Sequence, residues 1–159
     1  MEFSEFFESS WDPCLRAVLA VAGHPQQAED QVAEAFARAW RSWKTVSRHP
    51  APRAWVVRTA LNTGTSWWGR HGRELPLAGY DAAAPGDQAS GLETTVLRAL
   101  WRLPRRQREV IALRVFLDLD SEGIGAQLGI APATVRVHLA RAIAALRREL
   151  LPAKTLEVG

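Results

Sequence analysis

The sequence predicts an all-α protein made of two small helical domains joined by a flexible linker. Apolar residues recur at intervals of three and four along most of the chain, which is the period of an amphipathic helix. No segment shows a convincing strand pattern. A stretch rich in small residues, prolines and glycines has no sustained period, which is typical of a linker. The expected parts are a first domain at 1–70, a linker at 71–91, a second domain at 92–151 and a tail at 152–159.

Positive charge is concentrated in the second expected domain. The 159 residues carry a net charge of only +3, and 47% of them are hydrophobic, which is enough for a packed core. The segment from Arg98 to Glu149, however, contains ten arginines and only five acidic residues. Any contact with nucleic acid must therefore come from the clustered charge of this segment.

Cysteine content and hydropathy indicate a cytoplasmic protein. Cys14 is the only cysteine, which excludes an internal disulfide and a cysteine-based zinc site and makes a reducing compartment the default. The acidic N-terminus lacks the basic and apolar regions of a signal peptide. No apolar run approaches the length of a membrane span, so we expect no membrane contact.

The first domain should consist of amphipathic helices that end at proline or glycine. The first helix opens near residue 3, is expected to be interrupted at Pro13, and resumes until Gly23. Further helices are expected at 26–43 and 53–70. The predicted buried stripe of the helix at 26–43 is Val32, Ala35, Phe36, Ala39, Trp40 and Trp43.

The second domain should end in two helices joined by a tight turn. Asp120 or Ser121 can cap the first of them, and Gly129 suits the sharp turn after it. Pro132 suits the first position of the second helix. The expected helices are 92–103, 105–117, 121–128 and 132–150, and the predicted stripe of the last is Val135, Leu139, Ala142, Ile143, Leu146 and Leu150.

This pair of helices fits a helix-turn-helix, whose second helix enters the major groove of DNA. Arg136, His138 and Arg141 lie off its apolar stripe. The alternative is an ordinary helical hairpin with a solvated basic face. Gly125 is small where two crossing helices must approach closely. The spacing that favours DNA binding is that of Ile124, Gly125, Leu128, Gly129, Ile130 and Val135.

The chain resembles the extracytoplasmic-function sigma factors of bacterial RNA polymerase, with their region 2 and region 4 domains. The pair Trp67-Trp68 and the break at Gly23 resemble the actinobacterial SigE-like subgroup. The matching motifs of the first domain are AED (28–30), EAFARAW (34–40), PRAW (52–55), Asn62 and WWGRH (67–71). Those of the second are AL (99–100), RLPRRQREVIALRVF (102–116), LGI (128–130) and TVRVHLARA (134–142).

Several positions depart from the family pattern. Ala33 stands where the family commonly has Gln, and Ser66 and Gly69 stand where Asp and Arg are common. Leu119-Asp120 replaces the usual Leu-Ser, and Gly125 replaces the usual Ala. These departures concern the strength of contacts with polymerase and the −10 element, not the fold.

The resemblance implies that the second domain reads the −35 promoter element. Arg136 and Arg141 can contact guanine edges or phosphates, and one sequence does not distinguish the two. Val137 suits a thymine methyl group, and Thr134 suits a phosphate beside free N–H groups. His138 has no metal-ligand partner at i±4, which favours DNA contact or solvent. The alternative for each residue is an ordinary solvated side chain.

The resemblance also implies core RNA polymerase and promoter DNA as partners. Asp30, Glu34 and Arg38 are expected to dock on the β′ clamp helices, although the residues alone would suggest an ordinary charged face. The β flap is a further expected polymerase contact, and an anti-sigma factor is left open as another partner.

The end of the fourth helix is expected to meet the −10 element as a single strand. Trp67 and Trp68 lie about 100° apart around a helix, so both cannot face the core. One stacks on an exposed base, or both pack under the linker. The polar companions are Asn62, Ser66 and Arg70.

No catalytic constellation is visible, so we expect neither an enzyme nor a cofactor or metal. There is no phosphate-binding GxxxxGK[ST] loop. A transcription activator with a related turn motif is the main alternative, but residues 1–70 lack the β/α alternation of a receiver domain. A polymerase-associated module that binds no promoter is a second alternative.

Overall fold

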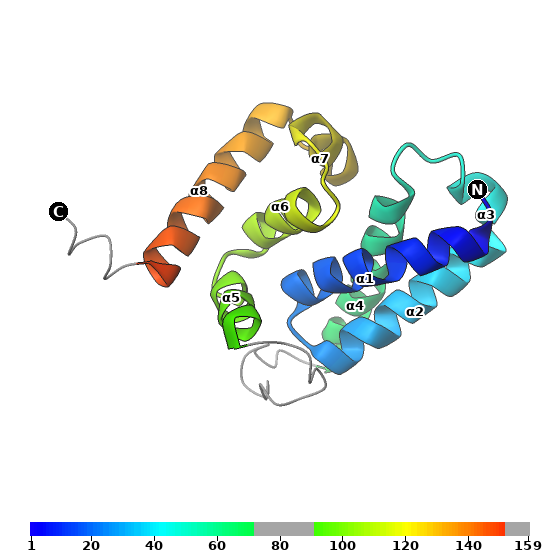
Figure 1. Cartoon of the computed structure of the whole chain (residues 1–159), viewed down its shortest axis with the longest axis horizontal. Helices are drawn as coiled ribbons and strands as arrows, with labels where there is room; N and C mark the ends of the chain where they lie inside the picture. Colours follow the sequence, from blue (N-terminus) through cyan, green and yellow to red (C-terminus); the bar gives the residue numbers. More distant parts are fainter. Residues whose placement is uncertain (72–90, 152–159) are drawn as a thin grey trace.

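The computed structural model describes residues 1–71 and 91–151, except for the side chains of residues 64–71 and 91–93 (Figure 1). Nearly all of the predicted linker, and the tail, fall outside the described residues. The described parts contain helices and no strand, which confirms the all-α prediction. The helices are α1 (Phe3–Ala22), α2 (Pro25–Arg41), α3 (Trp43–Val46), α4 (Pro52–His71), α5 (Gly91–Trp101), α6 (Arg105–Phe116), α7 (Ser121–Leu128) and α8 (Pro132–Leu150).

Helix α1 runs unbroken through Pro13, so the expected interruption there is wrong. Proline lacks the N–H group that would bind the carbonyl oxygen of Ser9, four residues earlier. Arg53 of α4 donates from Nη2 to this oxygen at 2.8 Å, and from Nε to Ser10 Oγ at 2.9 Å. The helix continues because a side chain from another helix satisfies the acceptor that proline leaves free.

Helices α1, α2 and α4 pack against one another, and the short α3 follows α2 at one end of the bundle (Figure 1). The amphipathic period explains the arrangement, since Val32, Ala35 and Phe36 are buried on one side of α2. At the end near α3, the ring of Trp43 lies 5.1 Å from that of Phe6 and 5.4 Å from that of Phe3. An aromatic cluster therefore closes this end of the core.

Two details of α2 differ from the prediction. The helix ends at Arg41, and Trp43 belongs to the short α3. Trp40, which was expected in the buried stripe, is 64% exposed. Its neighbour Ala39 is fully buried, and consecutive residues point about 100° apart around a helix. Ala39 therefore faces the core, and Trp40 is turned out of it.

The helix-turn-helix has the predicted boundaries. Asp120 caps α7, because its Oδ1 accepts the N–H of Gly123 at 2.8 Å. Gly129 ends α7 in the left-handed region, with φ 73°. At Gly125, a Cβ atom would lie 2.5 Å from the carbonyl oxygen of Ile130, so the turn requires glycine's lack of a side chain there.

The buried stripe of α8 is narrower than predicted. Val135 and Ala142 are fully buried, and Leu139 and Leu146 pack against the core. Ile143 is 38% exposed, so its expected burial is wrong. It lies about 80° around the helix from Val135, at the edge of the stripe that faces α6 and α7.

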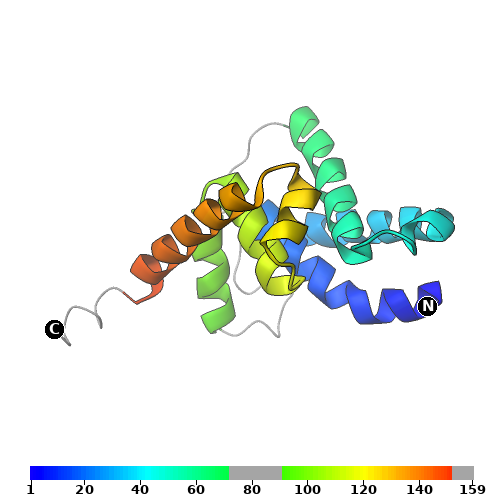
Figure 2. The ribbon, with the colours of Figure 1, turned by 90° about the horizontal axis from the view of Figure 1, so that it is seen from above.

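Helix α6 lies between α1 and α8 and connects the two halves of the molecule (Figures 1 and 2). Its four consecutive residues 110–113 are all buried, because both sides of the helix are covered. Helix α5 also contacts α1, where Trp101 Nε1 donates to the carbonyl oxygen of Leu19 at 2.9 Å. The two halves therefore share one hydrophobic core in this structure. The expected domain boundaries stay a prediction.

Candidate nucleic-acid and polymerase interfaces

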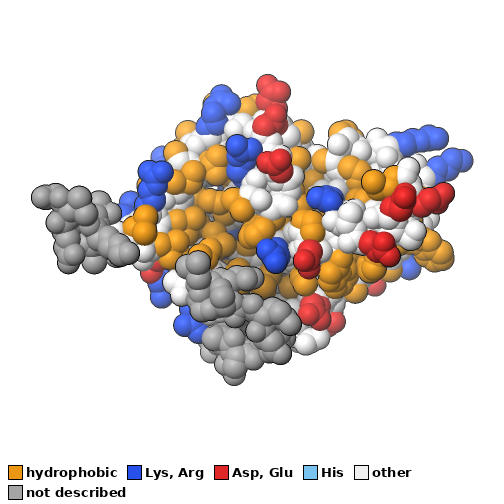
Figure 3. All heavy atoms as spheres, viewed as in Figure 1, with side chains coloured by type: hydrophobic (Ala, Val, Ile, Leu, Met, Phe, Trp, Pro, Cys, Tyr) orange, Lys and Arg blue, Asp and Glu red, His pale blue; other side chains and the backbone are white. Residues whose placement is uncertain are grey.

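The solvent face of α8 is basic and lies at the opposite end of the molecule from α2 in both ribbon views (Figures 1 and 2). Arg136, Val137 and Arg141 are exposed on this face, whereas Val135 is fully buried and fixes the helix on its own domain. Basic side chains gather along this edge of the surface (Figure 3). The described residues thus present an anchored helix with arginines directed outward.

The start of α8 leaves backbone donors free. Pro132 occupies its first turn, no side chain caps it, and no acidic residue lies there. The first N–H groups of a helix have no partner within it, so they can bind an anion. Thr134 is exposed beside them. His138 is half-buried, and its Nδ1 atom has no hydrogen-bond partner among the described residues.

The predicted polymerase-contact residues occupy one ridge of α2. Asp30, Glu34 and Arg38 follow at four-residue intervals, so they share a face. Glu34 Oε2 accepts Arg38 Nε at 3.0 Å and lies 3.6 Å from Nη2 of Arg41. All three of these side chains are largely exposed, so the pairs contribute little to stability. Asp30 is exposed and forms no ion pair with any of the described residues.

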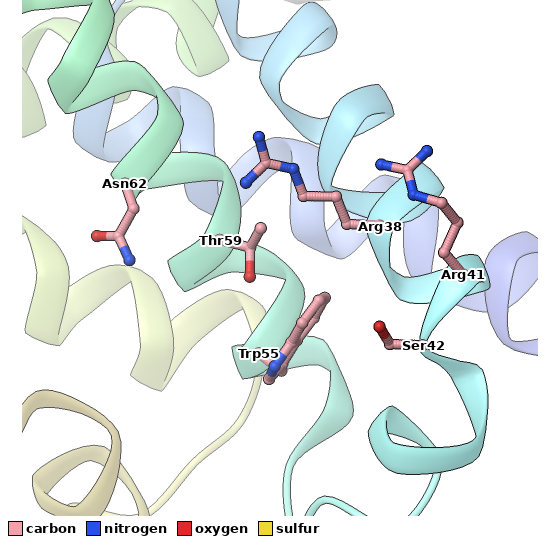
Figure 4. Close-up of a pocket in the computed structure, with 6 residues that line it drawn as sticks. All are labelled: Arg38, Arg41, Ser42, Trp55, Thr59 and Asn62. Atoms are coloured by element: carbon pink, nitrogen blue, oxygen red, sulfur yellow. The ribbon is translucent and has the colours of Figure 1, made fainter.

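A pocket of about 370 Å³ lies between the end of α2 and the face of α4 (Figure 4). In Figure 4, Arg38 and Arg41 extend from α2 on one side, and Trp55, Thr59 and Asn62 project from α4 on the other. The pocket therefore brings together Arg38, which was predicted to contact polymerase, and Asn62, which was predicted to contact the −10 element. Its full lining is Arg38, Arg41, Ser42, Trp55, Thr59 and Asn62.

Sequence reasoning found only Arg38 and Asn62 of this pocket. No contact was predicted for Trp55 or Thr59, yet both are half-buried and line the pocket. No contact was predicted for Arg41 either. The other predicted −10 residues, Ser66, Trp67, Trp68 and Arg70, lie on the backbone of α4, and their side chains fall outside the described residues.

An apolar groove runs along the other side of α2. It has a volume of about 470 Å³ and continues to the exposed ring of Trp40. Ala33, one of the departures from the family pattern, lies in it. Helical spacing gave no signal for this groove, because it forms between two helices. Its lining is Phe3, Phe7, Trp11, Ala33, Phe36, Ala37 and Trp40.

Comparison with known proteins identifies the family to which the chain belongs. The family model described as Sigma-70 region 2 matches residues 11–74, and the model described as Sigma-70, region 4 matches residues 94–146. The RNA polymerase sigma-E factor of Streptomyces coelicolor is 32% identical over 167 residues, which cover 99% of this chain and 93% of that protein. The chain belongs to the sigma-70 family.

This sigma factor is similar to others of the extracytoplasmic-function group. The sigma-E factor of Streptomyces avermitilis is 30% identical over 99% of this chain and 92% of its own length. The ECF sigma-E factor of Escherichia coli K12 is 29% identical over 77% of this chain and 73% of its own length. The sequence-based recognition of the family is therefore confirmed.

A solved structure supports the fold of this sigma factor. It is the co-crystal structure of the sigma factor RpoE in complex with the anti-sigma factor NepR from Bartonella quintana. The TM-score is 0.75 with 22% sequence identity, over 93% of this chain and 96% of that one.

The matched ranges divide the helices between two functional regions. α2, α3 and α4 lie within the region 2 match, and α6 and α7 lie within the region 4 match. The protein is thus a sigma subunit, which binds core RNA polymerase and directs promoter-specific initiation of transcription. No helix of the described ranges is long and apolar enough to cross a membrane. Those ranges also contain no group of three side chains suited to a metal ion.

Proposed function

We propose that this sigma factor contacts promoter DNA through two separate surfaces and polymerase through a third. The surfaces are the outer face of α8, the pocket between α2 and α4, and the ridge of α2 with its neighbouring groove. The protein acts as a non-catalytic initiation factor in the cytoplasm. The observation that carries the proposal is the anchored recognition helix, with Val135 buried and Arg136, Val137 and Arg141 exposed.

The −35 element is bound by the first half of α8 in the major groove. The N-terminal turns of a recognition helix reach base edges, and Arg136 lies in the first two turns of α8. An arginine there can bind guanine O6 and N7 with two hydrogen bonds. Val137 is 46% exposed beside it and suits a thymine methyl group. Thr134 and the free N–H groups of the first turn bind a phosphate.

The −10 element is bound as a single strand at the pocket between α2 and α4. The indole of Trp55 offers a stacking surface, and Arg38 and Arg41 supply positive charge for the backbone. Asn62 is exposed at the pocket and can form hydrogen bonds with a base edge. An aromatic ring with nearby arginines is the usual combination for single-stranded nucleic acid. Trp67 and Trp68, whose side chains fall outside the described residues, are proposed as further contacts of the −10 element.

Core polymerase is contacted by the ridge of α2 that carries Asp30 and Glu34. The apolar groove lies on the same helix, and its exposed ring of Trp40 suits a protein partner. Arg38 belongs both to this ridge and to the lining of the pocket, so it is shared between polymerase and DNA. The partner at this ridge is the β′ clamp helices, and the region 4 half meets the β flap. An anti-sigma factor would compete for the same surfaces.

Reconstitution with core polymerase tests the function. Core enzyme with this chain is offered a pool of templates with randomised −35 and −10 segments, and the transcribed templates are sequenced. Enrichment of a two-part motif supports the proposal. Binding to core polymerase without any enriched motif would instead identify a module that binds polymerase but no promoter.

The two DNA surfaces are then separated by variants. Arg136→Ala should relax the motif in its −35 part only, and Asn62→Ala in its −10 part only. Asp30 and Glu34 changed together to alanine should weaken core binding without altering the motif. A double variant that binds core polymerase as the parent does would show that the ridge of α2 is not the polymerase contact.

A further inference from the structure

A second basic pocket lies between the start of α6 and the second half of α8. Its volume is about 390 Å³. Its polar lining consists of Arg102, Gln107, Arg141 and Arg148, and no carboxylate lines it among the described residues. The remaining lining residues are Leu103, Pro104, Ala144 and Ala145, which leave room for a ligand between the arginines.

The arginines of this pocket keep unused hydrogen-bond donors. Arg102 binds Glu149 through one nitrogen, Nη1, and a guanidinium has five N–H groups. Arg141 and Arg148 form no ion pair or hydrogen bond within the described parts of the chain. With Glu149 counted, the site has an excess of two positive charges. Three planar donor groups around one small space suit a phosphate.

The first turn of α6 adds backbone donors to the same pocket. Pro104 precedes this 12-residue helix, no side chain caps it, and its first turn contains no acidic residue. The N–H groups of Arg105, Arg106 and Gln107 have no partner within the helix. Pro104 and Gln107 line the pocket, so the positive end of the helix dipole lies beside the arginines.

We propose that this pocket binds a phosphate group, which the DNA backbone beside the −35 element supplies. The inference rests on the proposed placement of α8 in the major groove. Arg141 belongs both to the outer face of α8 and to the pocket. Arg148 follows two turns later, about 10 Å along the helix. A strand that passes Arg141 therefore meets Arg148, Arg102 and the start of α6. A free phosphate ion has the same chemistry and is the other source.

Three variants of the full chain isolate the pocket. Arg148→Ala removes one of its donors. Gln107→Glu adds a negative charge at the third residue of α6, where the helix dipole favours an acid, so the fold is not weakened. Arg147→Ala is the matched control, because Arg147 is the preceding exposed arginine of the same helix and does not line the pocket.

The first measurement is binding of each variant holoenzyme to promoter DNA across several salt concentrations. Arg148→Ala and Gln107→Glu should weaken binding about three- to tenfold on matched and −35-mutated DNA alike. Arg148→Ala should also flatten the slope of log affinity against log salt by about one charge. Arg147→Ala should change both quantities less.

The second measurement titrates the free chain with inorganic phosphate, with chloride at equal ionic strength as the reference, and follows backbone amide shifts by NMR. The site is supported if the amide shifts of Arg106 and Gln107 saturate with phosphate and if Gln107→Glu abolishes them. If these shifts occur but the variants bind promoter DNA as the parent does, the pocket is a phosphate site whose ligand is a free anion. Parent-like DNA binding by both pocket variants, together with no saturable phosphate shift, would overturn the proposal.

Failure of the pocket can be told apart from failure of the proposed function. If the variants bind as the parent does and still discriminate matched from −35-mutated DNA, only the pocket proposal is lost. If the parent itself does not discriminate, the placement of α8 in DNA is wrong. Equal losses for Arg147→Ala and Arg148→Ala, without phosphate shifts, would show diffuse attraction and no pocket.

Discussion

Arg108 of α6 donates from Nε to the carbonyl oxygen of Val21 at 3.0 Å, and so caps the end of α1 from the other half of the chain. Val21 is among the last four residues of α1, whose carbonyl groups lack partners within the helix. The same guanidinium donates from Nη1 to Leu103 at 2.6 Å. Burial lowers the pKa of Arg108 from its ordinary value, but an arginine stays charged in proteins. One side chain thus joins region 2, region 4 and the α5–α6 turn.

Replacing Arg108 should therefore destabilise the whole molecule. Arg108→Met keeps the apolar stem but leaves two carbonyl acceptors without this donor. We expect a loss of about 1.5–3 kcal/mol in the free energy of unfolding, measured by urea denaturation. Arg106→Ala is the control, because its ion pair with Glu109 is at the surface and should cost less than about 1 kcal/mol. Equal losses for both variants would show that the contact between α1 and α6 contributes little.

Gly125 should not tolerate the alanine that the family commonly has there. A Cβ atom at this position would lie 2.5 Å from the backbone oxygen of Ile130, so the turn between α7 and α8 must shift. We expect Gly125→Ala to cost about 1–3 kcal/mol of stability. Gly123→Ala is the matched control in the same helix, because its Cβ would meet only side-chain atoms at 3.2 Å or more. Urea unfolding of both variants checks this, and equal stability would contradict it.

Cys14 should be inert in the folded protein. Burial raises the pKa of its thiol to about 12 from the ordinary 9.0, against the positive charge of Arg53, which lowers it. At pH 8 we expect iodoacetamide to label Cys14 slowly in buffer and rapidly in urea, because the thiolate is the reactive form. It is the only cysteine, so the label reports one site. Rapid labelling of the folded chain would contradict its burial.

The same shift predicts how stability depends on pH. The folded pKa lies above the unfolded one, so the neutral thiol is favoured in the folded state. Its contribution is complete below about pH 9 and is lost as the pH rises from about 9 to about 12. Urea unfolding of the parent and of Cys14→Ala across this range checks the sign. The parent should lose more stability than the variant.

Arg136 should determine the sequence preference at the −35 element. Arg136→Ala should reduce discrimination between matched and −35-mutated promoters by about 1–3 kcal/mol if the side chain binds a base. A phosphate contact would instead weaken binding to all sequences alike and flatten the salt dependence by about one charge. Holoenzyme binding at several salt concentrations separates the two. Parent-like binding at every salt would mean that Arg136 is only solvated.

Local signals explain why the helix-turn-helix was predicted to the residue. Asp120 caps α7, Gly129 ends it with a positive φ, and Pro132 begins α8, and each signal acts within a few residues of its position. The continuity of α1 through Pro13 had no such signal. It depends on Arg53, which is 44 residues from the carbonyl group that it binds.

Periodicity also leaves open which apolar residues face the core and which face a partner. Trp40 belongs to the helical stripe of α2, yet it lies exposed at the edge of the apolar groove. The pocket with Arg38, Arg41 and Trp55 arises only when α2 packs on α4. Sequence reasoning therefore found the charged candidates on each helix but not the sites that two helices form together.

The most direct test of the central claim is transcription in vitro by purified core RNA polymerase, with and without this chain, from templates that carry the enriched promoter and its −35-mutated form. We predict that initiation occurs at one start site and requires the chain. Its rate should fall when the −35 element is mutated. With Arg136→Ala, the difference in rate between the two templates should disappear. Initiation that is equal with and without the chain, or on both templates, would contradict its identification as a promoter-reading sigma subunit.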